Sequence, residues 1–355
     1  MSEFLNRKLS SLEPYTPGEQ PKEKLIKLNT NESPYYPSRC AVEAIKTQEL
    51  KDCRLYSDPE SGLLRSAIAD FYAQYGLTKD NVLVTNGSDE SLAFSFAAFC
   101  ENGAVFPDVT YGFYKVFASL FGVAYDEIPL NPDFTVSAEP YIRDSRTVFL
   151  ANPNAQTGIY LPLEDVEKIV SSNPSRVVII DEAYVDFGGE TAVQLIPRYP
   201  NLIVIQTFSK SRSLAGARVG FAMAQEGLIG DLNRVKFSFN PYNVNRLSER
   251  LAAAAITDVE YFNSCRTKIM ATRAKLAGAL KGMGFTVLPS SSNFILAGTP
   301  KMGGAELQAA LRKRGILVRH FDDERIKDYV RITIGSDAEI QTLIDSIKEI
   351  LYEKG

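Results

Sequence analysis

Short apolar runs alternate with longer amphipathic segments along the first two thirds of the chain. The runs are rich in β-branched residues and bounded by turn formers, so we expect buried strands at 82–85, 104–106, 123–128, 147–150, 177–181, 202–206 and 219–223. Helical spacing fills the gaps at 62–75, 88–100, 111–121 and 162–171. This alternation predicts an α/β fold whose large domain has a mainly parallel seven-stranded sheet, covered on both faces.

The pattern changes in the last third of the chain. A long amphipathic stretch at 245–281 predicts more than one helix. After it we expect short strands at 285–288, 293–297, 316–320 and 329–334, with helices at 304–314 and 337–351, which is typical of a small α+β domain. The first segment is instead polar and proline-rich. We therefore expect an N-terminal arm and substrate-lining segment at 1–36, a large domain at 37–244 and a small C-terminal domain at 245–355.

One lysine follows a predicted strand at a place where its chemistry can change. Lys210 comes shortly after the apolar run 202–206, with Ser209 beside it and Arg218 further on. Burial against an apolar wall removes the charge of an amine, which can then form Schiff bases with carbonyl groups. Ser209 and Arg218 suit a phosphate. Most lysines are simply solvated, but an amine beside a phosphate site indicates pyridoxal phosphate (PLP).

An aspartate ends the strand that precedes the lysine strand. Open α/β sheets bind ligands at the carboxyl ends of their strands, where Asp181 lies. Its carboxylate can pair with the pyridine nitrogen of PLP and keep it protonated, so that the ring acts as an electron sink. Tyr184 can donate its hydroxyl to the phenolate oxygen of the ring. Taken alone, Asp181 suits a helix N-cap equally well, and its position before Lys210 favours the cofactor role.

The strand predicted at 82–85 leads into a turn that suits an anion. Ser88 and Asp89 open the helix that follows, and the first N–H groups of a helix bind phosphate readily. Ordinary capping by Asp89 and Glu90 is at least as compatible with this pattern. Tyr111 follows the next strand and can either stack on a flat ring or pack in the core.

The segment Thr207–Gly220 resembles the PLP-lysine segment of fold-type I aminotransferases. Finer similarity to the histidinol-phosphate aminotransferase family lies at 28–34, 56–59, 86–90, 110–114, 181–187 and 330–335. The resemblance runs from about Leu12 to the C-terminus. It implies a fold-type I PLP-dependent transferase whose large domain binds the cofactor.

The resemblance also implies roles for the residues around the cofactor. Lys210 binds PLP as a Schiff base and then moves the substrate proton. Asp181 holds the pyridine nitrogen, and Tyr184 holds the phenolate oxygen. The other cofactor contacts that it implies are Tyr111 stacked on the ring and, around the phosphate, the backbone of Ser88 and Asp89, the side chains of Ser209 and Arg218, and Tyr56 from a neighbouring subunit.

For the substrate, the resemblance implies that Arg331 clamps the α-carboxylate of glutamate through two hydrogen bonds. Arg319 and Tyr15 are candidates for binding the substrate's own phosphate. Asn31 and Asn243 are expected to line the site.

One segment departs from the family pattern. The family usually has Asn-Asn-Pro-Thr-Gly, whereas this chain has Asn154-Ala-Gln-Thr-Gly158. The second asparagine, which would contact the phenolate oxygen, aligns with Ala155, and the proline aligns with Gln156. Either Asn154 takes over this contact or Tyr184 makes it alone.

Composition narrows the possible partners. The chain has 355 residues, 45% of them hydrophobic, which is enough for a large core. A net charge of −4 without a basic block argues against nucleic acid. A single histidine, His320, argues against histidine triads and His-rich metal sites, and four scattered cysteines predict free thiols and no metal. We expect a cytoplasmic protein without a membrane partner, since no signal sequence or long apolar run is present.

These observations predict a homodimeric PLP transaminase with small-molecule partners, an amino donor and a keto-acid acceptor. The resemblance implies amino transfer between L-histidinol phosphate and 2-oxoglutarate, giving imidazole-acetol phosphate and L-glutamate in histidine biosynthesis. Two alternatives stay open: an aromatic amino-acid aminotransferase, and a lyase similar to threonine-phosphate decarboxylases.

Overall fold

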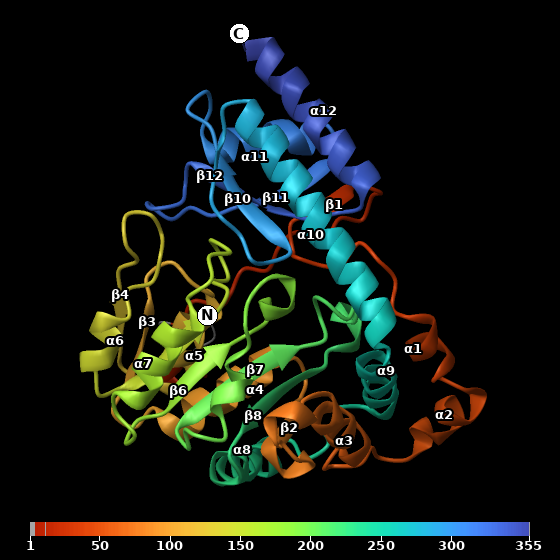
Figure 1. Cartoon of the computed structure of the whole chain (residues 1–355), viewed down its shortest axis with the longest axis vertical. Coiled ribbons are helices and arrows are strands. Elements are labelled where there is room, and N and C mark those ends of the chain that lie inside the picture. The colour runs from red at the N-terminus through yellow and green to blue at the C-terminus, as the bar shows by residue number, and fades with distance from the viewer. Residues whose placement is uncertain (1–3, 11, 355) are drawn as a thin grey trace.

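The computed structural model describes residues 4–10 and 12–354, so that residues 1–3 and 11 of the predicted arm lie outside the described residues. The described chain forms two sheets with helices packed around them (Figure 1). The larger sheet has seven strands in the order β2-β8-β7-β6-β5-β3-β4. The smaller has five strands in the order β1-β11-β12-β10-β9.

The strands of the larger sheet lie close to their predicted positions. They are β2 (Val82–Thr85), β3 (Ala104–Pro107), β4 (Tyr125–Ile128), β5 (Thr147–Ala151), β6 (Val178–Asp181), β7 (Leu202–Thr207) and β8 (Gly220–Ala224). Only β8 is antiparallel to its neighbours, β2 and β7. The predicted α/β class with a mainly parallel seven-stranded sheet is confirmed.

Apart from the more exposed edge strand β4, both faces of this sheet are buried, because alternate residues of the strands enter two separate apolar cores. Ile203 and Ile205 of β7 pack with helices α4 (Ser88–Phe99), α5 (Phe113–Phe121) and α8 (Glu226–Phe239). Val204 enters the opposite core. That core contains residues of α3 (Gly62–Phe71), α6 (Glu139–Arg143), α7 (Leu163–Ser171) and α9 (Arg246–Thr257).

The smaller sheet combines the end of the chain with a segment near its start. Its C-terminal strands are β9 (Thr286–Val287), β10 (Phe294–Gly298), β11 (Ile316–His320) and β12 (Tyr329–Thr333), and α11 (Gly304–Lys313) and α12 (Asp337–Lys354) pack on them. Strand β1 (Ile26–Leu28) pairs in parallel with β11. Part of the predicted arm therefore belongs to this sheet, while the boundaries at 36 and 244 stay predictions.

The helical stretch predicted at 245–281 is indeed more than one helix. It is divided at Asp258, whose carboxylate accepts a hydrogen bond from Tyr261 N at 3.2 Å and so caps α10 (Val259–Gly282). Figure 1 shows α10 running from the larger sheet region to the smaller one. This helix and the β1 segment connect the two sheets.

Several elements were not predicted from the sequence. They are α1 (Arg39–Glu43), α2 (Thr47–Lys51), α6, α8 and β1. Helix α8 contains Gly227 and Gly230, which lower helix propensity, and buries only Ile229, Leu232 and Lys236. Its weak pattern is overridden by packing against the sheet.

Within residues 4–10 and 12–354, no helix combines the length and the apolar character that a membrane span requires. In the same part of the chain, no group of three or more His, Cys, Asp or Glu side chains is placed to hold a metal ion. Cys40, Cys53, Cys100 and Cys265 are free thiols.

Candidate active site

A cavity of about 380 Å³ opens where the parallel strands of the larger sheet end. Asp181 at the end of β6 is paired with Ala151 of β5 and Ile205 of β7, so that side chains following these three strands meet at one edge. Twelve of the predicted site residues line this cavity, namely Tyr15, Asn31, Ser88, Asp89, Tyr111, Asp181, Tyr184, Ser209, Lys210, Arg218, Arg319 and Arg331.

Lys210 projects into the cavity from the loop after β7. Its Nζ donates to the carbonyl oxygen of Thr30 at 3.1 Å and lies 5.8 Å from the centre of the Tyr184 ring. Burial, together with the nearby positive charge of Arg331, lowers the pKa of Lys210 to about 8. A substantial fraction of this amine is therefore neutral near pH 8 and can act as a nucleophile.

Asp181 lies beside the lysine and is only 4% exposed. Its carboxylate accepts hydrogen bonds from Tyr114 Oη at 3.1 Å and from Ala183 N at 3.2 Å. Burial raises the pKa of Asp181 to about 6, against the lowering effect of these two donors. Asp181 can thus take one further donor, as the ring nitrogen of PLP would require.

Tyr114 was missed in the sequence. Its ring is fully buried among apolar residues of α5, but its hydroxyl reaches Asp181. The available signal was a tyrosine at the start of an apolar helix, because a buried tyrosine hydroxyl usually needs a partner.

Tyr184 is held from the opposite side by the N-terminal segment. Its hydroxyl oxygen accepts a hydrogen bond from Asn31 Nδ2 at 3.0 Å, and the amide oxygen of Asn31 accepts one from Thr333 at 3.0 Å. Asn31 has a φ of 56°, in the left-handed region that is strained for most residues. Asn31 thereby links Thr333 of β12 to Tyr184 in the cavity.

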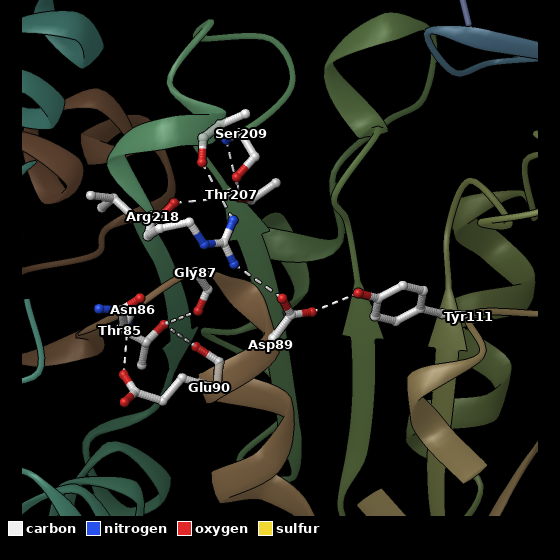
Figure 2. A network of polar contacts seen from close by, with 12 residues as sticks. Thr85, Asn86, Gly87, Asp89, Glu90, Tyr111, Thr207, Ser209 and Arg218 are labelled. Carbon is white, nitrogen blue, oxygen red and sulfur yellow. Dashed lines mark hydrogen bonds and ion pairs between the residues drawn. The ribbon is translucent and has the colours of Figure 1, made fainter. Parts of the chain in front are cut away.

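The turn before α4 forms an anion-binding corner, which we define as Ser88, Asp89, Ser209 and Arg218. Arg218 donates to the Asp89 carboxylate at 3.1 Å, and Asp89 also accepts a hydrogen bond from Tyr111 Oη at 2.7 Å, as Figure 2 shows. The N-terminus of α4 and the hydroxyl of Ser209 lie at the same corner. Together these groups present backbone N–H, hydroxyl and guanidinium donors that suit a phosphate.

Two glycines allow the close packing of this corner. A Cβ on Gly87 would lie 2.4 Å from Arg218 Nη2, and one on Gly220 would lie 2.3 Å from Ser88 N. A larger residue at Gly220 would push the start of α4 away from β8, and one at Gly87 would displace the guanidinium of Arg218.

Arg331 and Arg319 form the far side of the cavity. The guanidinium of Arg331 lies 5.1 Å from the ring centres of both Phe294 and Phe321, and its Nε is buried without a hydrogen-bond partner in the described chain. Arg319 donates to the carbonyl oxygens of Thr16 and Pro17 at 2.9 and 3.3 Å.

Tyr15 completes this side, since its ring stacks on Phe113 at 4.3 Å. The N-terminal arm is thus fastened over the cavity by Arg319.

Comparison with known proteins agrees with this geometry. The family "Aminotransferase class I and II" matches residues 23–347. The chain belongs to this family. Histidinol-phosphate aminotransferase 2 of Rhizobium meliloti is 49% identical over 354 residues, covering 99% of this chain and 100% of its own.

Solved structures show the same fold. The histidinol-phosphate aminotransferase of Sinorhizobium meliloti in complex with pyridoxal-5'-phosphate has a TM-score of 0.88 and 25% identity, covering 100% of this chain and 99% of its own. L-threonine-O-3-phosphate decarboxylase of Porphyromonas gingivalis shares the fold alone, with a TM-score of 0.80 at 22% identity, covering 92% of this chain and 100% of its own. The fold itself therefore does not separate transfer from decarboxylation.

Three predicted site residues of this aminotransferase do not line the cavity. Asn154 is buried in its own turn, where its amide nitrogen donates to Val109 O at 2.9 Å and its amide oxygen accepts from the backbone of Gln156 and Thr157. Asn154 therefore does not line the cavity, and of the two residues expected at the phenolate oxygen only Tyr184 does.

Asn243 is also turned away from the cavity. Its amide nitrogen donates to Val84 O and to the Glu90 carboxylate, which in turn accepts from Asn86 N at 2.7 Å. Asn243 therefore supports the turn before α4. Glu90 accepts hydrogen bonds at the start of this helix, as expected if it acts as an ordinary capping residue.

Tyr56 is the third of these residues. It is 79% exposed and stacks on Tyr242 at 4.5 Å, so it has no contact with the cavity of its own chain.

Proposed function

We propose that this chain transfers the amino group between L-histidinol phosphate and 2-oxoglutarate, with imidazole-acetol phosphate and L-glutamate as products. The observation that carries the proposal is Lys210, a lysine with a lowered pKa held between Asp181 and the anion-binding corner. The 49% identity to a histidinol-phosphate aminotransferase over nearly the whole chain supports the choice of substrate. We propose further that the enzyme acts in histidine biosynthesis in the cytoplasm.

Pyridoxal phosphate is the cofactor that these residues fit. When bound, it supplies a protonated ring that withdraws electrons from the substrate's α-carbon. The anion-binding corner offers donors for its phosphate, Asp181 offers an acceptor for its ring nitrogen, and Tyr184 offers a hydroxyl for its phenolate oxygen. Tyr111 lines the same cavity, and its hydroxyl donates a hydrogen bond to Asp89.

Lys210 performs two tasks in this proposal. Its amine attaches the cofactor, and after release it moves a proton to or from the substrate's α-carbon. A pKa of about 8 lets the amine both accept and donate a proton near neutral pH. The hydrogen bond to Thr30 O keeps Nζ at the cavity floor.

The two arginines recognise the acid groups of the substrates. Arg331 binds the α-carboxylate of glutamate and 2-oxoglutarate, because its guanidinium packs against two aromatic rings and keeps free donors. Arg319 and Tyr15, on the arm side of the cavity, bind the phosphate of histidinol phosphate. Selectivity depends on these local charges, since the net charge of −4 gives no general attraction for an anion.

Half-reaction spectroscopy tests the proposal. Glutamate, and then histidinol phosphate, should each convert the purified holoenzyme to its amino form, with histidinol phosphate far more efficient than phenylalanine. Preferred conversion by phenylalanine would indicate the aromatic aminotransferase. Release of carbon dioxide from threonine phosphate without amino transfer would indicate the lyase.

The active enzyme in this proposal is a homodimer whose sites are shared. Tyr56 is exposed in the single chain, and other large apolar side chains are exposed on neighbouring segments, among them Leu55, Phe239 and Tyr242. Such side chains are typical of an interface. Tyr56 then contacts the cofactor phosphate of the partner subunit.

Mixed dimers test the shared site. A Tyr56→Phe subunit should retain PLP weakly, and a Lys210→Ala subunit should be inactive. Their heterodimer should regain one intact site, with Lys210 from one chain and Tyr56 from the other. Tyr352→Phe, which alters another highly exposed tyrosine, on α12, is the control. Failure of the mixture to regain activity would refute the shared site.

A further inference from the structure

Gln156 occupies a position in the cavity wall that none of the roles above explains. It follows β5 in the turn Asn154–Gly158, is 9% exposed, and lines the cavity beside Arg331. Its backbone N–H is fixed by Asn154 Oδ1 at 2.9 Å. The side chain therefore extends from a rigid turn towards the arginine that binds the acid group.

The contacts of Arg331 decide how the Gln156 amide is oriented. Arg331 Nη1 donates to Ala155 O at 3.0 Å and to Gln156 Oε1 at 3.2 Å. A guanidinium has donors only, so the amide oxygen must face it and the amide nitrogen must point elsewhere. In the described part of the chain, Nε2 of Gln156 has no acceptor.

The same contacts leave a defined set of donors for a ligand. With Nη1 of Arg331 engaged, Nε is buried without a partner, and Nη2 donates to no described residue. A buried donor without an acceptor costs free energy, and an anion beside the guanidinium would satisfy Nε and engage the unused Nη2. The unused amide nitrogen of Gln156 belongs to the same wall.

We propose that Gln156 is a specificity-determining contact for the substrate's acid group. Its amide oxygen holds Arg331 in place, and its amide nitrogen donates a hydrogen bond to the carboxylate that Arg331 binds. The proposal rests on the proposed function, because it assigns a second donor to the same acid subsite. A neutral amide adds this donor without adding charge to the cavity.

Two variants of similar length test the contact. Gln156→Met removes both hydrogen bonds, while Gln156→Glu keeps an acceptor for Arg331 but turns a negative charge towards the ligand. The ligand is glutarate, the unreactive dicarboxylate with the carbon skeleton of glutamate, and its Kd for each holoenzyme is measured by calorimetry. Gln194→Met is the matched control, since Gln194 donates to Thr191 O at 3.0 Å outside the cavity.

We expect Gln156→Met to weaken glutarate binding about tenfold to a hundredfold, the range for a hydrogen bond to a charged group. Gln156→Glu should weaken it by at least about a further tenfold, because like charges then face each other. The control should bind as the wild type does. If Gln156→Met does not fold, Gln156→Asn, which shortens the side chain and withdraws the amide, takes its place with the same expected loss.

The outcomes separate this inference from the function on which it rests. A wild-type holoenzyme that binds glutarate, with Met and Glu variants that bind it equally well, would overturn the inference and leave the function intact. Equal losses of binding in both variants would also overturn it. If residue 156 only packed in the cavity wall, a methionine and a charged glutamate there would have the same effect on glutarate binding. A wild type that binds no glutarate would contradict the proposed function itself.

Discussion

The floor and the far wall of the cavity are built in different ways. The floor, defined here by Asp181 and Lys210, stands on neighbouring strands of one parallel sheet, and its distances are set by the register of β6 and β7. The far wall, defined by Tyr15, Arg319 and Arg331, comes from the N-terminal arm and the smaller sheet. Its parts are joined by side-chain contacts with carbonyl groups, such as those of Arg319 with Thr16 and Pro17.

In the proposed function, this difference separates the residues that carry out the chemistry from those that recognise the substrate. A bond-making lysine and its charge partner need fixed geometry, which adjoining strands supply. The far wall depends on how the N-terminal arm is held. Changes there can alter which substrate binds without moving Asp181 or Lys210. Substitutions in the floor should therefore affect every substrate alike, whereas substitutions in the wall should affect substrates differently.

The largest effect should come from Lys210→Ala. Without the amine, proton transfer at the α-carbon loses its catalyst, and transamination of every substrate should fall on the order of 10³–10⁴-fold. In the wild type, borohydride reduction followed by peptide mapping should place the cofactor on Lys210. Lys236 is an internal control: it is 1% exposed and burial lowers its pKa, but it lies outside the cavity. A label on Lys236 would refute the assignment.

Asp181→Asn should have the next largest effect. The variant keeps the shape of the side chain but loses the charge that holds the ring nitrogen protonated, so turnover should fall at least about 10²-fold while PLP still binds. Glu182→Gln is the matched control, because Glu182 is equally buried but bonds to Thr191 and Gln206 outside the cavity. Steady-state kinetics of both variants should show a loss confined to Asp181. Near-normal turnover in Asp181→Asn would make this residue purely structural.

The same substitution should stabilise the ligand-free protein. The pKa of Asp181 is about 6 in the folded chain against an ordinary 3.8, so the folded state binds more protons between these values. The wild-type free energy of unfolding therefore falls as pH rises through this window, whereas that of Asp181→Asn lacks this term. The variant's advantage should grow to at most about 3 kcal/mol above pH 6. Urea unfolding at pH 4.5 and 7 measures it, and an advantage independent of pH would contradict the burial argument.

The floor could be predicted from the sequence because its signals are local. An apolar run marks each strand, and the residue that follows it is placed by the rule that ligands bind at strand ends. Asp181 and Lys210 were found in this way, and both line the cavity. The remaining members of the seven-stranded sheet were predicted for the same reason.

Residues whose contacts join elements distant in sequence show where such signals end. Asn154 and Asn243 were predicted to line the site. Their amides instead form hydrogen bonds with neighbouring loop and strand backbone, and the sequence pattern does not indicate these contacts. Tyr114 was missed because its contact with Asp181 spans two elements distant in sequence. Gln156 was noticed only as a departure from the family pattern, since its contact with Arg331 joins the larger sheet to the smaller one.

The smallest of these effects should come from Arg319→Ala, and it should differ between substrates. Arg319 faces the cavity and can give charge-assisted hydrogen bonds to a substrate phosphate, so kcat/KM for histidinol phosphate should fall about tenfold to a hundredfold. Phenylalanine, which has no phosphate, should be affected far less. Arg319 also fastens the arm, and Arg312→Ala controls for this, because Arg312 holds the arm through Glu19 at 2.6 Å and does not line the cavity. If kcat/KM fell by the same factor in both variants and for both substrates, Arg319 would act only by holding the N-terminal arm. It would then not bind the substrate phosphate.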